Sequence, residues 1–268
     1  AATFMERGGV AKALIDAVTA WLGRLHGGLG LVSITTCAIF AAMCGSSVAT
    51  AIAMGTILIP AMLRNGYQPS FAGGILASAG TLGILIPPSL AFVVYGVLAD
   101  ASIPRLFLGG VVPGLLIAML MGVYVYRFSK KHGYVEREPV TMAFKIQKTV
   151  AALPALSVPF IVLGGLYGGF VTLTETAALS AVVAMILALF VYKGVKVRDF
   201  FKMMTFSVRN AAAIMIIIAM ALAFGHLIVE TGIAQMALDL MERWDIQPWQ
   251  FLLFVNIILI FLGMFLEV

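Results

Sequence analysis

The stretch that decides the fold is Gly80-Thr81-Leu82-Gly83-Ile84-Leu85-Ile86-Pro87-Pro88-Ser89, which lies inside an apolar segment that is almost free of charge. Proline removes a backbone donor and clashes with the preceding helical turn, so two prolines in series predict an interrupted helix. Pro88 takes away the usual donor for the carbonyl of Ile84, and a cation or a hydroxyl can replace it. The alternative is a proline kink without any ligand.

A second interruption is predicted at Met43-Cys44-Gly45-Ser46-Ser47, in the middle of the apolar run 29–63. Two half-length helices meeting there would form a re-entrant hairpin. Lipid supplies no hydrogen bonds, so broken backbone at membrane depth faces protein, water or a bound ion. The carboxyl end of a helix favours a cation. Alternatively, Gly45, Ser46 and Ser47 could simply be small residues that let two helices pack closely. Two breaks close together in the sequence favour instead a binding site near the membrane midplane, as in secondary transporters.

The composition is that of an integral membrane protein. The chain is 62% hydrophobic and 11% charged, whereas a soluble domain is about 25% charged. The chain has 17 Lys and Arg and a net charge of +5, and in a membrane protein such residues usually mark the cytoplasmic loops. A nucleic-acid-binding surface would show a basic stripe interleaved with aromatic residues, and the sequence has none. Cys37 and Cys44 would lie about 10 Å apart on one helix, too far for a disulfide. We expect an all-α membrane fold without a metal-binding cysteine site.

The remaining chain divides into helices and charged connections. We expect a cytoplasmic interfacial arm helix at 1–28 and a transport core at 29–97, made of the hairpin 29–63 and the broken helix 70–97. Region 98–229 should contain further spans at 106–126, 150–170, 175–192 and 206–228. A periplasmic arm helix at 230–248 and the start of a second hairpin at 249–268 should follow. Lys and Arg concentrate at 127–148 and 193–202, which predicts that both are cytoplasmic loops.

A weak internal repeat supports this division. A shift of 223 positions places Gly9 on Gly232, Asp16 on Asp239 and Trp21 on Trp244. An odd number of crossings separates the two copies in the predicted topology, so they would be inverted, and inverted repeats underlie alternating access. The chain begins without Met and stops at Leu266-Glu267-Val268 inside an apolar run. We therefore expect a piece of a longer permease, cut at the tip of its second hairpin.

The same residues resemble a known family. Cys44-Gly45-Ser46-Ser47-Val48-Ala49-Thr50-Ala51 and Ala79-Gly80-Thr81-Leu82-Gly83-Ile84-Leu85-Ile86-Pro87-Pro88-Ser89 are similar to strings of the large (DctM-like) membrane subunit of TRAP, or tripartite ATP-independent periplasmic, transporters. Gly164-Gly165, Thr174-Glu175 and Leu262-Gly263-Met264-Phe265 fit as well. The resemblance covers essentially the whole chain.

The resemblance implies a sodium-coupled elevator transporter of the bacterial inner membrane, with Na⁺ as coupling ion and no other cofactor. A periplasmic binding protein would deliver organic acids such as C4-dicarboxylates or sialic acid, and a small membrane subunit would complete the complex. By analogy, the first sodium site would use the backbone carbonyls of Cys44, Ser46, Gly83, Ile86 and Pro88. Candidates for the substrate path beside the two breaks are Gly45, Ser47, Thr81 and Ser89.

Three rival functions are considered. An intramembrane serine protease would use Ser46 or Ser47 as nucleophile and His226 or His26 as base, but the Pro-Pro break has no role in that chemistry, so we expect no enzyme. A membrane scaffold would only dock partners. The nearest rival is another ion-coupled carrier of broken-helix design that works without a binding protein.

Overall fold

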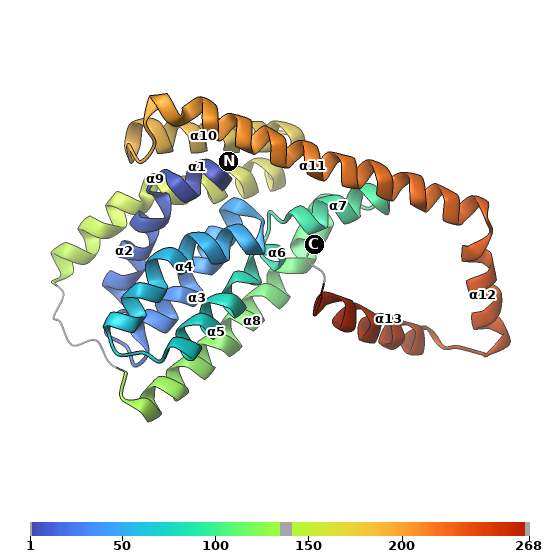
Figure 1. Ribbon diagram of the computed structural model, residues 1–268, viewed down its shortest axis with the longest axis horizontal. Coiled ribbons are helices and arrows are strands. Elements are labelled where there is room, and N and C mark those ends of the chain that lie inside the picture. Colours follow the sequence, from blue (N-terminus) through green and yellow to red (C-terminus); the bar gives the residue numbers. More distant parts are fainter. Residues whose placement is uncertain (1, 135–140, 266–268) are drawn as a thin grey trace. The chain divides into compact units, whose positions relative to one another are not determined.

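In the computed structural model, residues 2–134 and 141–265 are described, and the regular structure within them is entirely helical. The chain forms two compact units, 1–208 and 209–268, and helix α11 (Val197–Glu230) begins in the first and continues into the second. Figure 1 shows the helices in chain order. The all-helical expectation is therefore confirmed for the described residues.

The amino-terminal segment forms two helices rather than one. Helix α1 spans Ala2–Arg7 and α2 spans Val10–Leu22. The single helix predicted over 1–28 is wrong because Gly9 adopts a left-handed backbone with φ of 85°, which ends the first helix. Phe4 and Val10 are buried, at 2% and 0% exposure, so much of this segment packs into the first unit. Its placement as an interfacial arm stays a prediction.

The first predicted hairpin is made of α3 (Gly28–Cys44) and α4 (Ser47–Arg64), with a break at the predicted place. The two arms contain 17 and 18 residues, so each begins and ends within one or two residues of the predicted half of 29–63. Helix α3 occupies the centre of the first unit, since it contacts α2, α4, α5, α6 and α8 (Figure 1). Whether the hairpin re-enters on one side of a membrane stays a prediction.

The predicted broken helix consists of three pieces. Helix α5 spans Pro69–Gly80, α6 is a single turn at Leu82–Leu85, and α7 spans Leu90–Leu98. The chain is extended at Ile86 and Ser89, whose ψ angles are 121° and 132°. The interruption predicted from the two prolines is thus present in the structure.

The long helices that follow overlap the predicted spans but begin earlier in the chain. They are α8 (Ile103–His132), α9 (Met142–Tyr167), α10 (Leu173–Ile186) and the π-helical turn η1 (Leu187–Val191). The loop predicted at 127–148 is largely helix at both of its ends, and residues 135–140 lie outside the described residues. The loop predicted at 193–202 is likewise shortened, because α11 begins at Val197. Basic side chains mark the end of an apolar stretch but do not end a helix.

Six helical segments are long and apolar enough to cross a membrane among the described residues. They are Ser47–Arg64, Pro69–Leu98, Ile103–His132, Met142–Tyr167, Leu173–Val191 and Val197–Glu230. In the second unit, the carboxyl-terminal part of α11 is followed by α12 (Ile233–Arg243) and α13 (Pro248–Gly263). The last three residues of the predicted second hairpin, 266–268, lie outside the described residues.

The local structure of α12 agrees with the predicted repeat. Gly232 precedes α12 with φ of 71°, and its repeat partner Gly9 precedes α2 with φ of 85°. Both copies therefore begin with a left-handed glycine followed by a helix with a marked apolar face. The inverted orientation of the two copies stays a prediction.

Candidate functional site

The two interruptions of the first unit meet. The backbone N–H of Leu90, the first residue of α7, donates a hydrogen bond of 3.1 Å to the carbonyl oxygen of Gly45 at the tip of the α3–α4 hairpin. We call this region, residues 44–47 together with 83–90, the junction. Sequence reasoning predicted each break separately, and the structure brings them together.

Two glycines make the close approach possible. Gly45 has φ of 64°, and a Cβ atom there would lie 2.6 Å from the carbonyl oxygen of Pro88. A Cβ atom at Gly83 would lie 2.5 Å from the carbonyl oxygen of Ser46. Real Cβ atoms do not come so near to backbone oxygens, so a side chain at either position would push the hairpin tip away from the broken helix.

Several carbonyl groups of the junction lack a hydrogen-bond donor. Pro87 has no N–H, so the carbonyl of Gly83 has no partner four residues later. Within residues 2–134 and 141–265, no N–H or O–H group donates to the carbonyls of Cys44, Gly83, Ile86 or Pro88. Gly83 is buried, and the other three residues are half-buried. Unpaired carbonyls in an apolar setting are costly, and a cation is one partner that would satisfy them.

Two other carbonyls of the junction are already paired. The hydroxyl of Ser89 donates to the carbonyl of Ile84 at 2.6 Å, so the oxygen that Pro88 deprives of its donor is satisfied by a hydroxyl. The carbonyl of Ser46 accepts from the N–H of Thr50 at 3.2 Å and from its hydroxyl at 2.8 Å. Of the five carbonyls predicted to bind sodium, that of Ser46 is therefore the one that already accepts two hydrogen bonds, both from Thr50.

The predicted substrate-path residues have different surroundings. Gly45 is buried at the hairpin tip, and Ser89 is 1% exposed. Ser47 is half-buried at the start of α4. Thr81 is exposed, and its hydroxyl donates to the carbonyl of Ser78 at 2.7 Å. Thr81 therefore lies nearest to open space, while Ser89 has a structural partner.

Helix α8 supports the junction from behind, which sequence reasoning missed. A Cβ atom at Gly110 would lie 2.6 Å from the carbonyl oxygen of Leu85, and one at Gly114 would lie 2.9 Å from the side chain of Ile86. The two glycines are four residues apart and share one face of the helix. This spacing is the small-xxx-small pattern of close helix packing in membranes, and it could have indicated the contact.

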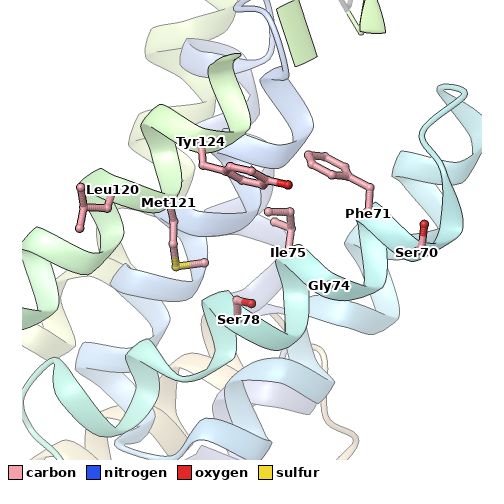
Figure 2. Close-up of a pocket in the computed structure, with 8 residues that line it drawn as sticks. All are labelled: Ser70, Phe71, Gly74, Ile75, Ser78, Leu120, Met121 and Tyr124. Carbon is pink, nitrogen blue, oxygen red and sulfur yellow. The ribbon is translucent and has the colours of Figure 1, made fainter. Parts of the chain in front are cut away.

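A separate cavity lies between α5 and α8. Its volume is about 440 Å³, and Figure 2 shows the lining residues, which are Ser70, Phe71, Gly74, Ile75, Ser78, Leu120, Met121 and Tyr124. None of the predicted site residues lines it. Most of its surface comes from apolar side chains. The hydroxyls of Ser70 and Ser78 on α5 and of Tyr124 on α8 also line it, and none of its lining residues is charged.

Comparison with known proteins identifies the family. The model of the DctM component of the tripartite ATP-independent periplasmic transporters matches residues 1–268. The chain belongs to this family. It is 40% identical over 264 residues to the C4-dicarboxylate TRAP transporter large permease protein DctM of Pseudomonas aeruginosa, an alignment covering 98% of this chain and 62% of that protein.

Other relatives have different cargo in their names. The isethionate TRAP transporter permease protein DctMQ of Oleidesulfovibrio alaskensis is 40% identical over 272 residues, which cover 100% of this chain and 42% of that protein. The sialic acid TRAP transporter permease protein SiaT of Haemophilus influenzae is 31% identical over 263 residues, 98% of this chain and 43% of that protein. The chain spans less than two thirds of the relatives' length in each case.

The comparisons agree with a multi-pass membrane protein of the permease type. The relatives are permease proteins, and in the described part of the chain six helical segments are long and apolar enough to span a membrane. The hydroxyl of Ser46 accepts from the N–H of Ala49 as a helix cap, His26 lies edge-on to Tyr126, and His226 pairs with Glu230. None of these contacts joins a serine to a histidine of the rival protease. The TRAP resemblance predicted from sequence is confirmed.

Proposed function

We propose that this chain forms the ion-coupling part of a secondary transporter that takes up organic anions on a sodium gradient. The observation that carries the proposal is the hydrogen bond from Leu90 to Gly45. It joins the two interrupted helices at the place where several carbonyls accept no hydrogen bond from the described residues. A site of this construction near the membrane midplane is typical of secondary transporters.

The oxygen donors of the junction fit sodium. Hard cations prefer oxygen ligands. The carbonyls of Cys44, Gly83, Ile86 and Pro88 accept no hydrogen bond from the residues that the structure describes, so they could supply such ligands. In the described part of the chain, no group of three or more His, Cys, Asp or Glu side chains could hold a metal. A monovalent ion held by neutral oxygens suits this arrangement better than a divalent ion held by carboxylates. The Ser46 carbonyl would join after Thr50 releases it.

The transport movement that we propose is an elevator. Helices α3 to α7 would carry the ion site and substrate across the membrane, while the outer helices stay in place. The support is the pairing of the two breaks into one body, together with the repeat of the left-handed glycine and helix at Gly9 and Gly232. Thr81 and Ser47 would border the substrate path.

The partners and cargo follow from the relatives. We propose that a small membrane subunit and a periplasmic binding protein complete the transporter, in the bacterial inner membrane. The family is described as tripartite, and one relative is named as a fused DctMQ permease. The names of relatives include C4-dicarboxylates, isethionate and sialic acid, so a carboxylate or sulfonate anion is the cargo class.

Uptake by proteoliposomes tests this function. Vesicles would contain the full-length permease with its small subunit, and radiolabelled succinate or sialic acid would be added with and without the binding protein. We expect uptake only with an inward sodium gradient and the binding protein present. Sodium-driven uptake that needs no binding protein would favour the rival carrier, and a lack of uptake of every organic anion would favour a scaffold.

A further inference from the structure

A charged cavity lies at the amino end of α11, away from the junction. Its volume is about 290 Å³, and it is lined by α1, the connection after η1 and the first turns of α11. The lining residues are Arg7, Gly194, Val195, Lys196, Asp199, Lys202 and Met203. None of these residues has a role in the proposed transport site.

The cavity is net positive. Arg7, Lys196 and Lys202 outnumber the single carboxylate of Asp199. No ion pair joins any of these three cations to a carboxylate within residues 2–134 and 141–265. The amino end of α11 adds positive partial charge from the N–H groups of its first turn. Cationic side chains with a helix amino end form a favourable setting for a phosphate group.

An apolar stripe leads away from the rim of this cavity along α11. It consists of Val197, Phe201, Met204 and Val208, which share one helix face at spacings of four, three and four residues. Val197 and Phe201 are 77% and 76% exposed. A free phosphate ion has no apolar part that could contact such a stripe, whereas a phospholipid carries acyl chains beside its headgroup. The combination favours a lipid as the source of the phosphate.

We propose that this cavity binds the phosphate of an anionic phospholipid, with Arg7, Lys196 and Lys202 holding the headgroup and Val197 and Phe201 contacting an acyl chain. Basic pockets between helices at the membrane surface bind anionic headgroups in this manner. The proposal does not depend on sodium coupling, since the cavity and the junction share no residue.

Native mass spectrometry of the full-length transporter tests the proposal. Dioleoylphosphatidylglycerol or dioleoylphosphatidylcholine would be added to the detergent-solubilised protein, and bound lipid would be counted. The double variant Lys196→Gln/Lys202→Gln removes two headgroup contacts. The control Lys130→Gln/Lys131→Gln removes the same charge from the exposed end of α8. The elution profile in size-exclusion chromatography shows that each variant is folded.

We expect the wild type to retain phosphatidylglycerol in preference to phosphatidylcholine. Each lysine removed from the cavity should weaken this retention about fivefold, and the control pair should change it less than about twofold. Equal losses in both double variants would overturn the proposal, since they would indicate only general surface charge. The variant Phe201→Ser removes an apolar contact of the proposed acyl chain. Displacement of the lipid by inorganic phosphate, together with unchanged lipid retention in Phe201→Ser, would also overturn the proposal and indicate a site for a free anion.

Discussion

The backbone N–H of Leu90 donates a hydrogen bond of 3.1 Å to the carbonyl oxygen of Gly45. The first N–H groups of a helix have no partner within the helix, and this bond gives the first N–H of α7 an acceptor from the α3–α4 hairpin. It fixes the hairpin tip against the broken helix, so the two interruptions form one structural feature. The carbonyls that remain unpaired around it define the candidate ion site.

Replacement of Gly45 by alanine tests the close approach. Gly45 and Gly66 both have a left-handed backbone, with φ of 64° and 78°, but only Gly45 lies against another segment. Gly66→Ala should cost about 1 kcal/mol of unfolding free energy from backbone strain alone. Gly45→Ala should cost roughly 2 kcal/mol more, because its methyl group meets the Pro88 carbonyl. Reversible unfolding in mixed micelles measures both variants.

Equal destabilisation by Gly45→Ala and Gly66→Ala would show that the hairpin tip does not contact the Pro88 carbonyl as described. The pair separates steric contact from strain, since the backbone cost is common to both substitutions.

Replacement of Gly83 by alanine should weaken sodium binding. The added methyl group would meet the Ser46 carbonyl oxygen at 2.5 Å and so displace the carbonyls on both sides of the junction. Gly73→Ala is the matched control on α5, since nothing lies within 4 Å of a Cβ atom there. We expect the sodium concentration for half-maximal uptake to rise at least about tenfold in Gly83→Ala and to be unchanged in Gly73→Ala. An unchanged sodium dependence in both would remove Gly83 from the ion site.

The hydroxyl of Ser89 should contribute to stability rather than to transport specificity. Ser89→Ala leaves the Ile84 carbonyl without its 2.6 Å partner in a half-buried place, which should cost about 1–3 kcal/mol. Ser180 makes a similar bond to the carbonyl of Ala177 at an exposed site, so Ser180→Ala should change the free energy by less than about 0.5 kcal/mol. The apparent melting temperature of both variants checks this difference. A larger loss in Ser180→Ala would contradict the assignment.

The hydroxyl of Tyr192 hydrogen-bonds to two backbone groups of α9. It accepts from the N–H of Ala155 at 3.1 Å and donates to the carbonyl of Ala151 at 2.9 Å, two groups that pair directly in a regular helix. Tyr192→Phe should therefore destabilise the protein by about 1–3 kcal/mol. Tyr124→Phe removes an exposed hydroxyl and serves as control. Unfolding midpoints that shift equally in the two variants would show that the bridge is unimportant.

The interruptions could be predicted from sequence because their causes are local. Proline lacks an N–H wherever it stands, so the break at Pro87-Pro88 required no knowledge of the fold. Gly45 ends α3 with a left-handed backbone, which glycine adopts readily. In contrast, the sequence alone allows either a cation or a hydroxyl as partner of the Ile84 carbonyl, and the structure shows that the Ser89 hydroxyl is the partner.

The other differences arise from tertiary contacts and from overinterpreted charge. Burial of Phe4 and Val10 depends on helices far along the chain, so a pattern within residues 1–28 could not show it. Lys130 and Lys131 indicated a loop, but cations are favourable in the last turn of a helix, and α8 includes both. The contact of Gly110 with the carbonyl of Leu85 likewise joins segments that only the fold brings together.

The most direct measurement of the central claim is a pair of cryo-electron microscopy maps of the full-length transporter, one in sodium and one in choline. We predict density between the carbonyl oxygens of Cys44, Gly83, Ile86 and Pro88 in sodium, and its loss in choline. Identical maps in the two salts, with these carbonyls paired to N–H groups or turned away from one another, would contradict the account.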